Sequence, residues 1–407
     1  MKILTVHTFY QQPGGEDVVF EAEGRLLSRF GHDVVKFREN NASIQTDSIS
    51  RSLHLATRTI WSRSSYHKLA DVISHFRPDV AHFHNTFPLI SPSAYYACKR
   101  AGVPVVQTLH NYRLFCPKAS FFREGRPCEE CLDHSLARSV RYGCYRDSRS
   151  ATAVVASMLG VHRLLGTWAK AVDRYVVLSS FARDKFIQAG LPASKMIVKP
   201  NFLEAEPGLG AHSGGHASFV GRLTEEKGIA TLLEAWTRFS DIALVIAGQG
   251  PMQPQIQQYV QQHTPGNVRY AGHVSREEVS RLIKDSSFLI FPSRWYEGFP
   301  MTIAEAFACG TPVIASRLGA MAEIVDDGRT GLHFTPGDAD DLARKVEWAW
   351  AHPNEIRDMG RNARAEYEAK YTAERNYKML LEVYQQVMQE ARQPLTVPRC
   401  KVSRVAN

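Results

Sequence analysis

The sequence has no uncharged apolar run of about 18 residues or more, so it offers no segment of the length that a membrane-spanning helix needs. Its first residues, MKILTVHTFYQQPGGED, hold only a few apolar positions before polar and acidic ones, unlike a secretory signal peptide. We therefore expect a cytoplasmic protein that neither spans a membrane nor is exported.

Cysteine is scarce, with seven residues in a chain of 407. The count is odd, and four of the seven fall between positions 116 and 144. Because no signal peptide is present, this distribution argues against a framework of disulfides.

Charge is unevenly divided. Residues 1–199 carry 27 Lys and Arg against 16 Asp and Glu, a net +11, whereas residues 200–407 carry 22 against 25, a net −3. A basic half suits nucleic acid, an anionic membrane surface or a phosphorylated acceptor, and a merely solvated basic face is the remaining reading. Charge alone does not choose among them.

Short apolar or β-branched runs alternate with helical patterns twice along the chain. The expected strands of the first half are 3–7, 33–37, 79–84, 103–110 and 175–178, and those of the second half are 217–220, 242–247, 268–271, 287–291 and 312–315. Such alternation is typical of parallel, doubly wound sheets. The sequence therefore predicts an α/β protein with two Rossmann-like domains that face each other across a cleft.

The expected domain bounds follow from the stretches between these runs. An N-terminal domain, 1–199, contains a cysteine-rich insertion at 116–144, and a C-terminal domain spans 200–370. The stretch 199–215, with its Pro, Gly, Ser and His, is the expected linker. We expect a last helix at 371–392 to pack back toward the N-terminal domain. The tail 393–407 has two prolines and no apolar period, so we expect it to be disordered.

Two basic residues follow the first strand of the second half. Arg222 comes directly after that strand, and Lys227 lies just before the helix expected near Gly228. A guanidinium offers a fork of donors and an ammonium a point charge, so together they suit a diphosphate. The pair alone is weak evidence, because basic residues beside helix starts are common.

Two carboxylates stand in the run SRWYEGFPMTIAEAFACGTPVIAS. Glu297 ends the loop after an expected strand, and Glu305 lies on the helix that follows. The start of that helix, near 299–302, offers free N–H groups and a positive dipole end to an anion. Because carboxylates accept hydrogen bonds from vicinal hydroxyls, the segment suits a sugar or ribose beside a phosphate. A surface glutamate and a helix-start glutamate would be the purely structural alternative.

These strings together resemble the family 4 retaining glycosyltransferases, which have the GT-B fold and include many enzymes of bacterial surface-polysaccharide synthesis. The most specific match is EGFPMTIAEAFACGTPVIAS, and FVGRLTEEKG, LVIAGQGP and YAGHVSREE precede it in the family's order. Near the front, Gly14 and Gly15 before an acidic helix, the run GHDV and the run TLHNYRLFCP also resemble the family. The resemblance covers nearly the whole chain.

The resemblance implies a role for each matching position. Arg222 and Lys227 would hold the donor diphosphate, Glu305 the nucleotide ribose, and Glu297 the transferred sugar. His110 matches a histidine that projects into the cleft near the donor sugar. These residues other than Glu305 form the expected catalytic set.

The rest of the expected donor site also comes from the resemblance. Gly15 matches a glycine whose backbone approaches the donor phosphate, where a side chain would be in the way. Val274 matches a loop whose backbone contacts the base. The donor-binding set is completed by Gly14, Gly298, Phe299, Pro300 and Met301. His84 and Asn85, at a comparable strand end, are expected only to support His110 or to face the acceptor.

Two other patterns carry no site. Gly248-Gln249-Gly250 lacks the third glycine of a dinucleotide fingerprint. Asp338-Ala339-Asp340 has the Asp-x-Asp form of a metal site, but it follows Pro-Gly and opens a helix, so N-capping explains it better. We therefore expect catalysis to need no metal or other cofactor, the phosphate charge being balanced by Arg222, Lys227 and a helix dipole.

The cysteine-rich insertion departs from the simplest family members. Cys116, Cys128, Cys131 and Cys144 could furnish a structural zinc site with four thiolates. Four reduced thiols in a partly buried loop are the alternative.

The resemblance implies a transferase that moves a sugar from a nucleotide-diphosphate sugar to a saccharide or lipid-linked saccharide, with the departing phosphate taking the acceptor's proton. A nucleotide-sugar epimerase or hydrolase of the same fold, a non-catalytic sugar-nucleotide sensor and a nucleic-acid-binding protein are the alternatives. Nucleic acid is disfavoured, because the basic excess is spread over a long α/β domain without a recognition-helix pattern.

Segment 138–174 interleaves seven basic residues with Tyr142, Tyr145, Leu164, Leu165 and Trp168. Such a mixture suits peripheral binding to the anionic inner face of a membrane. The alternative is an ordinary amphipathic helix over 161–172 whose Leu and Trp pack on the sheet.

Overall fold

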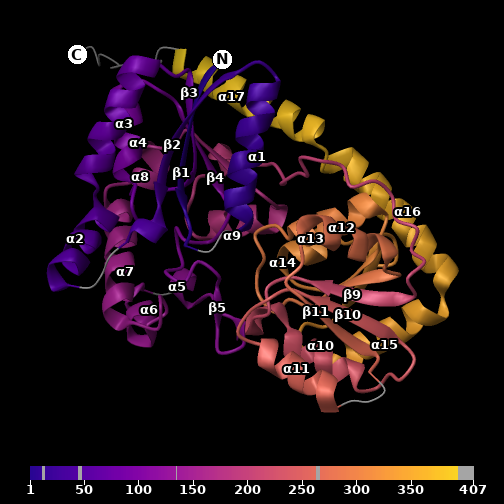
Figure 1. Ribbon diagram of the computed structural model, residues 1–407. Coiled ribbons are helices and arrows are strands. Elements are labelled where there is room, and N and C mark those ends of the chain that lie inside the picture. Colours follow the sequence, from indigo (N-terminus) through magenta and orange to yellow (C-terminus); the bar gives the residue numbers. More distant parts are fainter. Residues whose placement is uncertain (12–13, 45–47, 134, 263–265, 393–407) are drawn as a thin grey trace, which may run out of the picture.

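The computed structural model describes residues 1–11, 14–44, 48–133, 135–262 and 266–392. Within these ranges the chain forms two six-stranded sheets, parallel throughout, which helices cover on both faces (Figure 1). The α/β fold with two doubly wound units that the sequence predicts is confirmed. The predicted tail, 393–407, lies outside the described residues.

The first sheet has the strand order β2-β1-β3-β4-β7-β8. Its strands are β1 (Lys2–Phe9), β2 (Asp33–Asn40), β3 (Val80–Asn85), β4 (Val105–Leu109), β7 (Arg174–Val177) and β8 (Met196–Val198). β1 has six consecutive buried residues, as expected for a central strand that is covered on both faces. The helices beside this sheet are α1 (Gly15–Arg29), α2 (Ile49–Ile60), α3 (Arg63–Phe76), α4 (Ser93–Arg100), α7 (Arg149–Leu164), α8 (Thr167–Lys170) and α9 (Ser180–Gln188).

The second sheet repeats this plan with the order β11-β10-β9-β12-β13-β14. Its strands are β9 (His216–Val220), β10 (Ala243–Ala247), β11 (Val268–Gly272), β12 (Phe288–Phe291), β13 (Val313–Ser316) and β14 (Gly331–Phe334). Its helices are α10 (Ile229–Trp236), α11 (Gln253–Gln262), α12 (Arg276–Asp285), α13 (Met301–Cys309), α14 (Gly319–Ile324), α15 (Ala339–Ala351) and α16 (Pro353–Lys370). Asp338 caps α15, since its Oδ1 accepts from the amide of Asp341 at 2.9 Å, which confirms the capping role.

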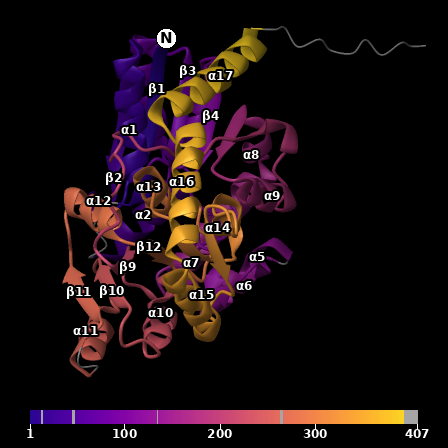
Figure 2. The ribbon, with the colours of Figure 1, turned by 90° about the vertical axis from the view of Figure 1, so that its right-hand side faces the viewer.

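The last helix, α17 (Ala373–Arg392), returns to the first sheet. Figures 1 and 2 show α16 and α17 following one another along the outside of both units. The apolar spacing of Leu380, Val383, Tyr384 and Val387 gives α17 one buried face. That face packs on residues of the first sheet that include Ile3 and Val80.

Three local expectations differ from the structure. The short strands β8 and β14 are additional to those predicted. The expected linker begins in the interior, because Lys199 and Phe202 are buried. A continuous helix over 161–172 was wrong: α7 ends at Leu164, and Gly166 adopts a left-handed conformation (φ 66°) before the short α8.

The cysteine-rich insertion is a small substructure at the lower edge of the first unit (Figure 1). It holds the antiparallel pair β5 (Phe122–Arg123) and β6 (Arg126–Pro127), then α5 (Glu130–Asp133) and α6 (Ala137–Tyr142). At the tip of the hairpin, a Cβ on Gly125 would lie 3.2 Å from Glu225 and 3.5 Å from Arg294, both in the second unit. The insertion therefore reaches across to the neighbourhood of Lys227.

Candidate functional site

The carboxyl ends of the two sheets meet at the predicted site. His110 directly follows β4, and Gly298 lies in the loop between β12 and α13. A Cβ built on Gly298 would lie 2.4 Å from the carbonyl oxygen of His110, so the two backbones are in contact. A second contact is made by Glu323 on α14, whose oxygens accept from the amides of Ser180 (2.8 Å) and Phe181 (2.9 Å) at the start of α9. The structure thus has the two units closed on each other.

Lys227 and Glu297 form an ion pair at this junction. Nζ of Lys227 lies 2.7 Å from Oε1 of Glu297, whose side chain is 7% exposed. The same oxygen accepts from Oγ of Ser293 (2.8 Å) and from Nε1 of Trp295 (2.7 Å). The ammonium and the carboxylate expected to contact different parts of a donor are therefore paired with each other.

Arg222 lies nearby, two residues after β9 ends at Val220. It is exposed, and none of the ion pairs among the described residues includes it. In contrast to Lys227, its guanidinium is available to an incoming anion without breaking a contact.

Glu305 stands on the first turns of α13, half-buried. Burial raises the pKa of its carboxyl, and the neighbouring Arg276 on α12 acts in the opposite direction. Val274 lies between the end of β11 and the cap of α12, and Pro300 caps α13. Phe299 is 9% exposed and packs in the core, with partly buried Met301 against the same cluster.

Gly14 and Gly15 stand at the start of α1. Gly14 is the N-cap, and its amide donates to Oδ2 of Asp17 at 2.7 Å. A Cβ on Gly15 would meet nothing within 4 Å, so there is open space above its backbone. That space fits the expected approach of a phosphate to this turn, where the helix dipole is positive.

His110 is half-buried, and its Nε2 lies 2.9 Å from Nδ1 of His84. Burial lowers the pKa of both imidazoles well below the usual 6.5, so both are neutral at pH 7. Asn85, in contrast, holds the backbone where β3 ends. Its Nδ2 donates to the carbonyl of Thr8 (2.8 Å), and its Oδ1 accepts from the amide of Phe87 (2.9 Å).

Sequence reasoning missed a carboxyl that contacts Asn111, the residue after His110. Glu16 is 9% exposed, and its Oε2 accepts from Nδ2 of Asn111 at 3.0 Å. Burial raises the pKa of Glu16, while His7 and the hydroxyl of Tyr10 act in the opposite direction. The available signal was that Asn111 follows His110 and Glu16 follows the Gly-Gly turn. Ser293 and Trp295, which hold Glu297, were also missed.

The four cysteines of the insertion gather but do not stand at ligand spacing. None is in a disulfide, and burial, followed by the neighbouring thiols of Cys116, Cys144 and Cys128, raises the pKa of Cys131 to about 12. Among the described residues, no three of these sulfurs lie within 4.8 Å of one another. The four thiols lie near one another within the insertion, and the structural zinc site stays a prediction.

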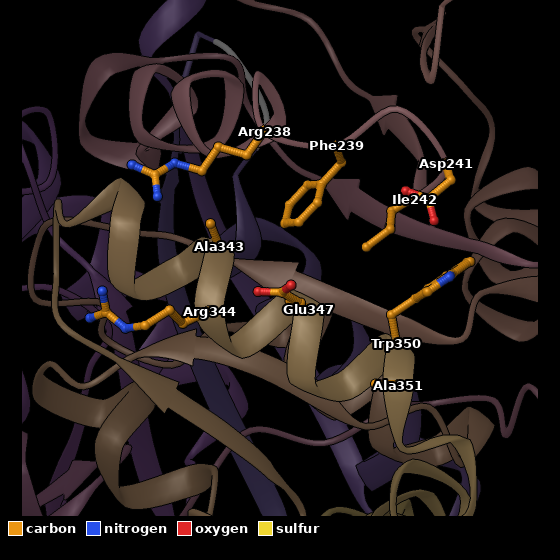
Figure 3. Close-up of a pocket in the computed structure, with 9 residues that line it drawn as sticks. All are labelled: Arg238, Phe239, Asp241, Ile242, Ala343, Arg344, Glu347, Trp350 and Ala351. Carbon is orange, nitrogen blue, oxygen red and sulfur yellow. The ribbon is translucent and has the colours of Figure 1, made fainter.

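Two cavities lie away from this junction. One, of about 400 Å³, opens between α15 and the segment that joins α10 to β10 (Figure 3). Arg238 and Phe239 line one side, and Glu347 and Trp350 the other. A second, of about 470 Å³, lies near α15 and α16 and includes Trp348. None of the predicted site residues lines either cavity.

The interfacial segment 138–174 is partly buried. Trp168 is 6% exposed and packs in the core of the first sheet, as the core-helix alternative expects. Leu164 and Leu165, however, are 90% and 49% exposed, and the adjacent α2 exposes Ile49 and Leu53. In the described ranges, no helix is long and apolar enough to cross a bilayer.

Each half of the chain matches the model of a known protein family. The family model for "Glycosyltransferase Family 4" matches residues 13–206, and that for "Glycosyl transferases group 1" matches residues 215–366. The chain is 34% identical over 159 residues to the D-rhamnosyltransferase WbpZ of Pseudomonas aeruginosa, covering 38% of this chain and 41% of that protein. With the alpha-maltose-1-phosphate synthase of Mycolicibacterium smegmatis it shares 29% identity over 269 residues, 57% and 69% of the two chains. It spans less than half the length of several curated relatives that it matches.

Solved structures share the fold over nearly the whole chain. HepE of Anabaena in complex with UDP superimposes with a TM-score of 0.70 at 17% identity, covering 95% of this chain and 100% of that one. Sucrose-phosphate synthase from Thermosynechococcus elongatus gives 0.68 at 18% identity, covering 96% and 99%. The predicted arrangement of two domains, the GT-B fold, is thereby confirmed.

Proposed function

Because the chain belongs to the family 4 glycosyltransferases, we propose that it transfers a sugar from a nucleotide-diphosphate sugar to a saccharide or lipid-linked saccharide in glycan biosynthesis, with retention at the anomeric carbon. HepE, which shares the fold, binds UDP and, in another structure, UDP-glucose, which supports a nucleotide-sugar donor. The D-rhamnosyltransferase similarity supports a saccharide product.

The pairing of Lys227 with Glu297 beside the exposed Arg222 is the observation that carries this proposal. A bound diphosphate would draw the Lys227 ammonium away from the carboxylate and toward two negative phosphates. Glu297 would then be free to accept from a hydroxyl of the donor sugar while Ser293 and Trp295 keep it in place. Donor binding and sugar orientation are thus coupled through one ion pair.

The proposed chemistry is substitution on the face that the nucleotide leaves. The bond from the anomeric carbon to the β-phosphate oxygen breaks, the acceptor oxygen bonds to that carbon, and its proton passes to the phosphate. Arg222 and Lys227 stabilise the charge that develops on the phosphate, which is where electrostatic catalysis is most effective. The scheme uses no divalent metal, because Arg222, Lys227 and the start of α13 would together balance the charge of the diphosphate.

A nucleotide-release assay tests the function. Purified protein is incubated with UDP-, GDP- and ADP-sugars, with and without saccharide acceptors, and the free nucleotide is measured. A transferase releases nucleotide only with an acceptor, whereas an epimerase or hydrolase releases it with water alone. Binding without release would identify a sensor and would contradict the proposal.

We also propose peripheral binding to an anionic membrane on the cytoplasmic side. Leu164, Leu165, Ile49 and Leu53 are exposed on adjacent helices, and α2, ISRSLHLATRTI, has two arginines and no acidic residue. Exposed apolar side chains among basic ones fit the boundary of anionic headgroups. A lipid-linked acceptor would meet the enzyme at this face.

A further inference from the structure

A buried chain of polar side chains runs from His110 into the first domain. Nδ1 of His84 lies 2.9 Å from Nε2 of His110, and Nε2 of His84 lies 3.3 Å from Oε2 of Glu23 on α1. Oε1 of Glu23 accepts from Nζ of Lys199 at 2.6 Å. The side chains of Glu23, His84 and Lys199 are at most 1% exposed, so these contacts are shielded from bulk solvent.

The same corner does not suit a metal ion. Glu23, His82 and His84 each offer a ligand atom within 4.8 Å of the others. Both nitrogens of His82 are already engaged, with the hydroxyl of Tyr384 and with Oγ1 of Thr108, each at 2.7 Å. The ammonium of Lys199 balances the charge of Glu23. A second cation would be repelled there, so the cluster has another use.

Lys199 determines how Glu23 can act. A buried ammonium needs a charged partner, and Glu23 provides it, with Asn376 of α17 a further acceptor at 3.2 Å. An ionised carboxylate only accepts hydrogen bonds. Oε2 of Glu23 and Nε2 of His84 lack an aligned hydrogen bond among the described residues, and they lie 3.3 Å apart. Nδ1 of His82 is farther from the same oxygen, at 3.8 Å, and is hydrogen-bonded to Tyr384. A bare lone pair on Nε2 would face a negative charge, so the proton belongs on Nε2.

The remaining protons follow from that assignment. A neutral imidazole carries one donor and one acceptor, and its tautomer is set by its partners. With Nε2 of His84 protonated, Nδ1 of His84 must accept, and Nε2 of His110 must donate to it. The Nδ1 of His110 is then an acceptor, and no hydrogen bond within the described part of the chain engages it.

We propose that Glu23 is a positioning residue that, through His84, fixes His110 as the Nε2–H tautomer, so that His110 presents an acceptor nitrogen to a hydroxyl of the donor sugar. The identity of that hydroxyl-bearing ligand rests on the proposed function, whereas the tautomer does not. Both imidazoles remain neutral because burial lowers their pKa values.

Glu23→Gln tests the proposal, because Lys199 orients the new amide. The ammonium keeps the carbonyl oxygen, so the NH₂ group faces Nε2 of His84 and donates to it. His84 then donates from Nδ1, and His110 changes to the Nδ1–H tautomer. Two-bond ¹H–¹⁵N spectra of protein labelled in its histidine rings distinguish the tautomers, with His110→Gln identifying the signal.

The expected result is a lone-pair shift at Nδ1 of His110 in the wild type and a protonated shift there in Glu23→Gln. Tyr384→Phe is the matched control, since it alters the same buried network on the far side of Glu23 and should leave His110 unchanged. An Nδ1–H tautomer in the wild type, or no reversal in the folded Gln variant, would overturn the proposal.

If Glu23→Gln does not fold, the neutral pair Glu23→Leu with Lys199→Met replaces it. Without the carboxylate, His110 should lose its single tautomer and show an averaged shift, and an unchanged spectrum would overturn the proposal. In turnover, Glu23→Gln should lower kcat/KM by about tenfold relative to Tyr384→Phe, the effect of one misdirected hydrogen bond. The spectra need no substrate, so inactivity of the wild type with every donor would contradict only the proposed transferase.

Discussion

Nζ of Lys227 and Oε1 of Glu297 are 2.7 Å apart, although one is expected to bind phosphate and the other a sugar. The pair compensates the charge of a largely buried ammonium. It also implies that the two residues respond differently to substitution, because removing the carboxylate frees the cation.

Lys227→Met should weaken nucleoside diphosphate binding and raise the barrier to transfer by roughly 2 to 4 kcal/mol, as when one oxyanion donor is lost. Glu297→Gln should lower turnover as well, but nucleotide should bind as tightly as to the wild type or more tightly. Calorimetric titration with the nucleotide measures the difference. Equal weakening in both variants would contradict the competition between diphosphate and carboxylate.

Glu305→Ala should weaken nucleotide binding by removing the ribose acceptor, with a smaller effect on kcat. Because burial raises the pKa of Glu305, wild-type affinity should fall on acidification at a higher pH than for an ordinary carboxyl, as protonation removes the acceptor. Glu305→Gln should lack that acidic limb. Glu347→Ala, at the remote cavity of Figure 3, is the control and should bind like the wild type.

Transfer should continue in excess EDTA over minutes, since protein cations balance the diphosphate. The rate of nucleotide release is compared with and without the chelator, and Mg²⁺ or Mn²⁺ is then added back. Loss of activity in EDTA with recovery on adding either ion would show that a divalent cation is needed, in addition to Arg222 and Lys227, to neutralise the diphosphate.

If the insertion binds zinc, purified protein should contain about one equivalent by elemental analysis. Cys128→Ser with Cys131→Ser should then lower metal content and melting temperature, and also turnover, because the hairpin tip at Gly125 touches Glu225 and Arg294. Cys98→Ser, a buried thiol on α4, should leave the metal content unchanged. Wild-type protein that contains no metal and melts at the same temperature as the double variant would contradict the zinc site.

Vesicles containing phosphatidylglycerol should sediment the protein, neutral vesicles should not, and salt should release it, because each Lys or Arg near the surface contributes about 1 kcal/mol. Leu164→Ser with Leu165→Ser should weaken this binding. Leu209→Ser removes another exposed leucine, from a different part of the chain, and serves as control. If the protein shows no salt-sensitive binding to the anionic vesicles, the proposed membrane contact is contradicted.

The sequence predicted the strands well where the apolar run is long. β1 and β10 were found because four or more apolar or β-branched residues stand together, and Asp338 was assigned correctly because capping leaves a local pattern. β8 spans only three residues, and β14, GLHF, has Gly and His among its four, so neither contains a distinctive apolar run.

The site was predictable in part, for a different reason. Glu297 and Lys227 stand in strings that resemble a family, but their ion pair joins residues 70 positions apart and leaves no trace in the sequence. Lys199 lies in a stretch of Pro, Gly and Ser that reads as a linker, yet its charge is buried against Glu23, 176 positions away. Such partners are decided by packing between elements, which local composition does not encode.

The contact between Gly298 and the carbonyl of His110 limits how this cleft can vary. A single methyl group at position 298 would occupy space that the opposite backbone already fills, 2.4 Å away. The close approach of the two sheets at this point therefore requires a residue without a Cβ atom. Any larger residue at position 298 would push the two carboxyl ends apart at this point, and the contact of Glu323 with the start of α9 would be strained with it.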